Sequence, residues 1–276
     1  MIPERLKDRV VDVFLVGTMA LLILFFYVPI LTLVVFSFTN SRVLTFPIEG
    51  FSLEWYGELF RKPDFLTAVA NSAIVAVIST IFATVLGSAG AVAWIRYRFR
   101  FQNIFRAVSF LPLLFPQLLL GVVMLLWFSV LGNWLGFSTG LATVIIGHIV
   151  YITPFALVIV AVQVHGFDET LEDAARDAGA TGWEVFREIT FPLLWPGILS
   201  AATFAFLLSW GNFYVSYSLA GTARTLPIFV YSGIAVGSSP IYPALATLNF
   251  IPALILVFLV DFLRRRALKR QKLATA

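Results

Sequence analysis

The chain has 276 residues, of which 60% are hydrophobic and only 12% are charged. The charged share is about half that of a soluble domain, so a water-exposed globular surface is excluded. The absence of cysteine excludes a disulfide-stabilised scaffold. The composition therefore indicates an integral membrane protein.

Long stretches without Asp, Glu, Lys or Arg mark the expected membrane spans. A helix needs about 20 apolar residues to cross the bilayer, so four of these stretches each hold one span. The stretch 107–167 holds two, because a glycine-rich turn at 132–140 interrupts it. We expect one all-α transmembrane domain over residues 1–276, with six spans at about 13–38, 66–95, 107–131, 141–164, 196–220 and 243–263.

The basic residues predict the orientation of these spans. Most of the 19 Lys and Arg residues lie in the N-terminal segment, the second and fourth connections and the C-terminal tail. Because basic segments stay in the cytoplasm, both termini are expected there. This topology explains the net charge of +4 without a nucleic-acid partner. The first apolar stretch is too long for a signal peptide and is interpreted as a retained span.

The first outer loop, at about 39–65, contains a predicted short helix over residues 50–60. Ser52 is its expected N-cap. Four apolar or aromatic side chains gather on one face of this helix: Trp55, Tyr56, Leu59 and Phe60. We interpret this face as an aromatic anchor at the membrane surface, with a docking surface for an outside partner as the alternative.

The connection 165–195 breaks the positive-inside pattern, because it holds seven acidic residues and only two basic ones. Its periodicity predicts a helical hairpin over about 168–192. The first helix carries a narrow stripe of mostly small side chains: Leu171, Ala174, Ala175 and Ala178. Alanine lets another body approach closely, so the stripe predicts a docking face. Packing of the hairpin under its own bundle is the alternative.

Local signals define the ends of the two hairpin helices. Gly179 suits the left-handed position that ends a helix. Thr181 and Glu184 form a capping box that starts the second helix. Pro192 is expected to stop that helix before the fifth span.

Part of this hairpin resembles a motif of ABC importer permeases, EAA-x3-G-x9-I-x-L-P. The matching residues are Asp173-Ala174-Ala175, Gly179, Ile189 and Phe191-Pro192. Asp173 stands where the motif has Glu and Phe191 where it has Leu, and both changes preserve charge or apolarity. The resemblance covers nearly the whole chain and is nearest to the second membrane subunit of spermidine/putrescine importers, with further matches at 27–30, 55–56, 82–84, 87–88, 96–100, 237–240 and 244–247.

The resemblance implies a type I ABC importer permease fold in the bacterial inner membrane. Residues of about 168–180 would insert into a groove of a cytoplasmic ATPase dimer. The implied coupling residues are Leu171, Glu172, Asp173, Ala174, Ala175, Arg176, Ala178 and Gly179. Three of them, Glu172, Asp173 and Arg176, would pair with the rim of the ATPase. Other implied partners are membrane lipid, a second permease subunit in a heterodimer, and a periplasmic or extracellular substrate-binding protein.

No catalytic or metal site is expected. The sequence lacks the G-x-x-x-x-G-K-[ST] loop that holds ATP phosphates, so ATP and Mg are expected on the partner ATPase and no cofactor on this chain. Two histidines and no cysteine give no metal-ligand set. An intramembrane enzyme is disfavoured, because no nucleophile–base pair is visible. His148 is interpreted as a helix-packing residue, with a role in the solute pathway as the alternative.

Uncharged polar groups within the spans are the candidates for a solute pathway, because their burial has a cost unless they find partners or line a wet path. Gln117 follows a proline that breaks backbone hydrogen bonding, and Asn212 follows Trp210-Gly211 in the fifth span. The pathway candidates are Gln117, Trp210, Asn212 and Tyr214. Interhelical hydrogen bonding is the alternative use of such groups.

The expected solute is a small organic amino compound. Polyamine permeases tend to carry acids near positions where this chain has Gln117, Gly211 and Asn212. These replacements favour a less charged solute, such as an amino-acid derivative, an opine or an aminophosphonate, and leave a polyamine open. An ion-coupled secondary transporter is the main alternative function, but it would need intramembrane acids that the spans lack. A purely structural membrane subunit is a further alternative.

Overall fold

The computed structural model describes residues 4–236 and 239–274, with side chains described for 11–235 and 239–262. Regular structure in these residues is almost entirely helical, and one isolated bridge pairs Thr39 with Phe51. Six helices are long and apolar enough to cross a membrane. The predicted all-α membrane fold with six spans is therefore confirmed.

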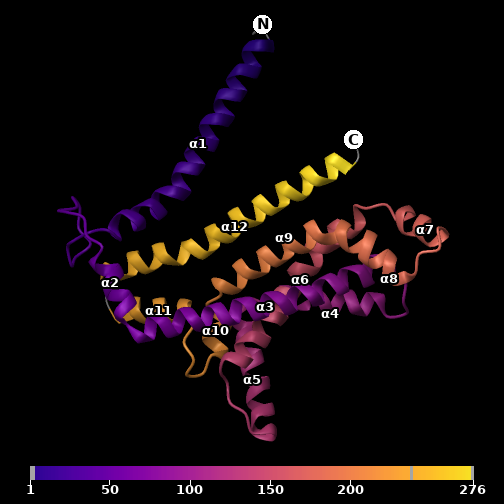
Figure 1. The fold of residues 1–276 in the computed structure, drawn as a ribbon. Helices are drawn as coiled ribbons and strands as arrows, with labels where there is room; N and C mark the ends of the chain where they lie inside the picture. The colour runs from indigo at the N-terminus through magenta and orange to yellow at the C-terminus, as the bar shows by residue number, and fades with distance from the viewer. Residues whose placement is uncertain (1–3, 237–238, 275–276) are drawn as a thin grey trace. The chain divides into compact units, whose positions relative to one another are not determined.

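The helices are labelled in Figure 1. Their bounds are α1 (Glu4–Phe36), α2 (Glu54–Arg61), α3 (Pro63–Arg96), α4 (Gln102–Leu114), α5 (Gln117–Leu135), α6 (Leu141–His165), α7 (Thr170–Asp177), α8 (Gly182–Val185), α9 (Phe191–Trp210), α10 (Tyr214–Leu219), α11 (Leu226–Val236) and α12 (Ile241–Ala274). A π-helical turn, Phe186–Thr190, joins α8 to α9.

The chain divides into two compact units, which are described separately. The smaller unit comprises Met1–Lys62 and Ser232–Pro252, and the larger one comprises Pro63–Tyr231 and Ala253–Ala276. The larger unit contains the predicted coupling hairpin and all four pathway candidates.

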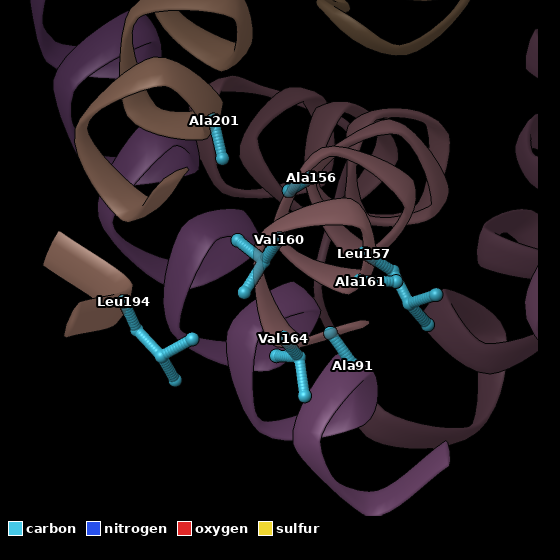
Figure 2. Packing of buried hydrophobic residues seen from close by; sticks show 8 residues of the cluster. All are labelled: Ala91, Ala156, Leu157, Val160, Ala161, Val164, Leu194 and Ala201. Atoms are coloured by element: carbon cyan, nitrogen blue, oxygen red, sulfur yellow. The ribbon is translucent and has the colours of Figure 1, made fainter. Parts of the chain in front are cut away.

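Helices α3, α6 and α9 form the core of the larger unit. Figure 2 shows apolar side chains of these helices meeting in one cluster: Ala91 from α3, Ala156, Leu157, Val160, Ala161 and Val164 from α6, and Leu194 and Ala201 from α9. Half of this set is alanine, so the helix backbones approach closely, as is usual where helices associate within a membrane.

One face of α3 repeats a small residue at every fourth position. Ala83, Gly87 and Ala91 lie on this face, and both alanines are fully buried. A Cβ added at Gly87 would stand 2.6 Å from the Cβ of Ala156 and 2.8 Å from the backbone nitrogen of Leu157. Helix α6 thus packs directly against the α3 backbone at Gly87. We refer to these three residues as the α3 seam.

Two of the predicted spans are interrupted. The third was expected at 107–131, but α4 ends at Leu114 and α5 begins at Gln117 after an extended Phe115-Pro116 segment, where the chain changes direction (Figure 1). The fifth was expected over 196–220, with Gly211 in its middle allowing close approach or a kink. Instead α9 ends at Trp210, and α10 begins at Tyr214. Proline in the first case and glycine in the second remove helical constraints at the break.

The loop between α1 and α2 in the smaller unit is held by aromatic side chains of α2. The indole Nε1 of Trp55 donates to the carbonyl of Thr39 (2.7 Å), and the Tyr56 hydroxyl lies 2.7 Å from the Ser37 hydroxyl. The Ser52 hydroxyl accepts from the Glu54 backbone amide, but Ser52 precedes the N-cap of α2, which is Leu53 and not Ser52 as predicted. Trp55 is buried, so this residue fixes the loop and is not available as a membrane anchor. Phe60 does face outward.

Candidate functional site

Helix α7 has a well-defined start and end. At its start, the Asp168 carboxylate accepts from the Thr170 backbone amide (3.0 Å). At its end, Gly179 has φ +93°, Ala180 N–H donates to the Ala175 carbonyl, and Gly179 N–H donates to the Arg176 carbonyl. These two bonds form a Schellman motif, so Gly179 has the helix-ending role that the sequence predicts.

The small-residue stripe of α7 faces outward. Leu171 is 48% exposed, Ala174 and Ala178 are exposed, and Ala175 is half-buried. No residue of α7, which the structure describes in full, is buried. This geometry does not fit a hairpin that packs its stripe under its own bundle. The described residues of this chain leave this short apolar face uncovered.

The charged residues of α7 divide into an inner and an outer set. Asp173 and Arg176 are exposed and pair with each other at 2.7 Å. Glu172 points inward: its side chain is 12% exposed, and its Oε1 accepts from the Thr190 hydroxyl (2.6 Å). Glu172 therefore joins the two arms of the hairpin, and the expected pairing of this residue with an ATPase rim does not fit its position.

The second arm of the hairpin continues into the membrane without a stop. Thr181 and Glu184 form the predicted capping box at the start of α8. Pro192 does not end the helix, contrary to the sequence prediction, because it lies in the first turn of α9, where its missing N–H is tolerated. The preceding π-helical turn links α8 and α9, and Phe191 N–H donates to the Phe186 carbonyl. The hairpin and the fifth span are thus mechanically continuous.

The cap at Asp168 makes α7 sensitive to acid. Hydrogen bonds from the backbone and side chain of Thr170, with a smaller contribution from the nearby Arg96 charge, lower the pKa of the Asp168 carboxyl. Because the pKa is lower in the folded chain, the ionised Asp168 carboxylate stabilises the fold at pH values above the ordinary carboxyl pKa. This contribution is lost as the pH falls through the pKa of the folded chain.

We therefore expect the protection factors of the α7 amides, after correction for the intrinsic pH dependence of exchange, to fall over that acid range. The Asp168→Asn variant should show a flatter pH profile, because asparagine caps a helix without titrating. Hydrogen–deuterium exchange with mass spectrometry measures both profiles, and Asp177→Asn, at an exposed position of the same helix, is the matched control. An unchanged pH profile in Asp168→Asn would contradict this assignment.

The pathway candidates gather near the two breaks in the spans, but most of them have internal partners. Gln117 begins α5 and donates through Nε2 to the Tyr151 hydroxyl on α6. Asn212 is buried, and its Oδ1 accepts from the Val215 backbone amide (3.1 Å), which caps α10. Trp210 is buried and stacks on Phe206. Gln117 thus makes the interhelical hydrogen bond that was the alternative interpretation.

Tyr214 differs from the other candidates, because it is half-exposed and belongs to a cluster of rings. Phe213 lies at the centre, with ring centroids 5.4 Å from Tyr214, 5.2 Å from Tyr217 and 4.8 Å from Tyr231. The three tyrosines are exposed. We call these four residues the aromatic patch. Sequence reasoning selected only Tyr214, because Tyr231 comes from the separate helix α11.

His148 connects α6 to both sides of the break in the fifth span. The fully buried ring has Nδ1 2.8 Å from the Ser209 hydroxyl on α9 and Nε2 2.9 Å from the Ser216 hydroxyl on α10. This arrangement supports the helix-packing interpretation of His148. Ser209 and Ser216 were missed in the sequence, although two serines seven residues apart on either side of Gly211 are a usable signal.

The arrangement of helices is shared with membrane subunits of ABC transporters. The chain is similar to a chain in the crystal structure of a bacterial ABC transporter involved in the import of the acidic polysaccharide alginate (TM-score 0.74, 17% identity, 94% of this chain and 96% of that chain). It is also similar to a chain of the inward-facing MetNI methionine ABC transporter (TM-score 0.63, 20% identity, 73% and 95% covered). These two similarities show that the chain shares the fold of chains found in ABC transporters.

The sequence identifies the family more closely. Residues 83–272 match the family described as binding-protein-dependent transport system inner membrane component, and the chain belongs to this family. It is 35% identical to the putrescine transport system permease protein PotI of Escherichia coli (strain K12), over 90% of this chain and 89% of that protein. Identity to the spermidine/putrescine transport system permease protein PotC of the same strain is 34%, over 90% and 93%. The predicted permease function is thereby confirmed.

Proposed function

We propose that this chain is one of two membrane subunits of an ATP-driven importer in a bacterial inner membrane, paired with a different permease chain. Helix α7 docks into a groove of a cytoplasmic ATPase dimer, which carries ATP and Mg, and the chain itself performs no chemistry. Both termini then lie in the cytoplasm. The observation that carries this proposal is the outward stripe of α7, ended by the Schellman motif at Gly179.

The route from the ATPase to the solute pathway is supported by the continuity of the second hairpin arm. Movement of α7 reaches the π-helical turn through the Glu172–Thr190 hydrogen bond and passes from that turn into α9. Helix α9 leads to the break before Tyr214, where the pathway candidates lie. Substrate delivery by an outside binding protein completes the cycle.

We infer that the solute carries at least one ammonium group. The relatives PotI and PotC are named for putrescine and spermidine. Although the carboxylates expected for a polyamine are missing, an aromatic face attracts a cation with about 0.5–2 kcal/mol. An amine can therefore be attracted to this region without an acidic side chain.

The test is the ATPase activity of the complex in liposomes, purified with its co-expressed neighbours and supplied with the outside binding protein. Putrescine, spermidine, opines, amino acids and aminophosphonates are compared. We expect an amine to stimulate hydrolysis, and Tyr214→Leu to raise its half-maximal concentration roughly fivefold, equivalent to about 1 kcal/mol. Tyr27→Leu, at an exposed tyrosine outside the patch and outside the hairpin, is the control. Uptake that survives ATP depletion but follows an ion gradient would instead support a secondary transporter.

A further inference from the structure

Arg96 occupies an unusual position for a membrane-flanking arginine. It is the last residue of α3, yet its side chain is only 10% exposed. Its guanidinium lies over the ring of Phe167, 4.2 Å from the centroid, and its NH1 pairs with the Glu169 carboxylate. Both partners belong to the short segment that joins α6 to the coupling helix α7. Arg96 thus links the end of one span to the base of the hairpin.

The other arginines of this connection do not share that environment. Arg98, Arg100 and Arg106 are exposed, as expected for basic residues that flank a span, although Arg100 lies over the ring of Phe101 and Arg106 over that of Trp94. A buried guanidinium has a large desolvation cost unless it is paired. Its position at the C-terminal end of α3 offsets part of that cost through the helix dipole. The Nε and NH2 groups of Arg96 have no hydrogen-bond partner among the described residues, so the Glu169 pair and the Phe167 ring hold the charge.

The hairpin does not rest on a continuous apolar base. A cavity of about 320 Å³ lies between the hairpin and the ends of α3, α6 and α9. Its lining includes Arg96, Phe167, Glu169, Glu172 and Thr190. Because no residue of the fully described α7 is buried, discrete polar contacts position it. The Glu172–Thr190 bond connects it to the second arm, and the Arg96–Glu169 pair connects its base to α3.

We propose that Arg96 is a positioning residue that couples α7 to α3. When α7 shifts on its ATPase, the pair with Glu169 and the contact with Phe167 carry the displacement to the cytoplasmic end of α3. The α3 seam then moves α3 and α6 together, while the π-helical turn moves α9. The hairpin therefore acts on the bundle at two points. This inference rests on the coupling role proposed above for α7.

The test measures transport and ATP hydrolysis in the same proteoliposomes. In Arg96→Gln, we expect the solute transported per ATP hydrolysed to fall about tenfold, with complex assembly and basal hydrolysis retained. Arg96→Glu and Glu169→Arg should each be uncoupled, and the double variant Arg96→Glu/Glu169→Arg should recover much of the ratio. Arg98→Gln, two residues away and exposed, is the matched control and should behave as the parent protein.

Phe167→Leu provides a second variant if Arg96→Gln does not assemble. It keeps the ion pair, removes the ring and should lower the ratio by a smaller factor. An unchanged ratio in assembled Arg96→Gln, or no recovery in the double variant, overturns the proposal.

Gly179→Asp distinguishes the positioning role of Arg96 from the coupling role of α7 itself. If it uncouples transport while the Arg96 variants do not, the hairpin couples without Arg96. If Gly179→Asp transports normally, the coupling role of α7 itself is wrong.

Discussion

The Gly179→Asp variant is expected to lose transport by about tenfold or more while the protein still inserts into the membrane and assembles. At φ +93° most residues with a side chain are strained, by roughly 1–2 kcal/mol, and Asp and Asn are strained less than the others. A Cβ at this position meets no atom within 4 Å, so the variant does not disturb the packing of the chain itself. The added charge instead projects from the end of α7, beside the outward stripe.

Matched variants distinguish backbone strain at residue 179 from an obstruction that prevents α7 from docking. Asparagine tolerates the left-handed region, so Gly179→Asn should keep most of the transport activity that Gly179→Val loses. Ala174→Trp leaves the helix end intact and adds bulk to the exposed stripe, so it should uncouple as Gly179→Asp does. Asp177→Trp carries the same bulk at an exposed position away from the stripe and should transport normally. Equal transport by the two tryptophan variants would contradict a docking face on the stripe.

A leucine at Gly87 is expected to prevent a stable fold. Even the Cβ would come within 2.6–2.9 Å of Ala156 and Leu157, including backbone atoms that cannot rotate away. Overpacking of this kind costs about 1–3 kcal/mol for the first added atoms, and more for a full side chain. Gly87→Ala should therefore lower the melting temperature measurably, and Gly87→Leu should yield little folded protein.

Thermal unfolding in detergent, followed by the loss of monodisperse protein, measures this effect. Gly17→Ala is the control, because it places the same methyl group on a spanning helix where no atom lies within 4 Å. If Gly87→Ala were as stable as Gly17→Ala, the close approach of α6 to the α3 seam would be wrong. Transport activity is not needed for this comparison, so it is independent of any partner subunit.

The sequence predicted the hairpin more accurately than the interior of the spans. Gly179 and the Thr181–Glu184 capping box act through local backbone chemistry, so their signals survive without knowledge of the fold. The breaks before Gln117 and after Trp210 lie inside uniformly apolar stretches. Because hydropathy is similar on both sides of each break, it predicts one span across each of them. Only Pro116 and Gly211 indicate where the helices end.

The partners of buried polar groups could not be predicted, because they come from distant segments. Arg96 read only as one of several basic residues that fix orientation, and its burial depends on Phe167 and Glu169 beyond α6. The aromatic patch likewise requires α11 to bring Tyr231 to Phe213. Glu172 was expected on the outer face, but the turn at Gly179 brings Thr190 back toward it. Periodicity predicts the face of the helix on which a side chain lies, but it does not predict which residue from another segment contacts that side chain.

The order of the loop between α1 and α2 affects how fast a soluble protein would bind to it. Trp55 and Tyr56 fix the loop at Thr39 and Ser37, so the segment is already ordered before any encounter. Fixing the backbone of one residue costs about 1–2 kcal/mol of conformational entropy. A disordered loop of the same length would lose this entropy each time a protein bound to it. A loop that is ordered before binding avoids this loss of conformational entropy. Association can then approach the rate set by diffusion and orientation alone.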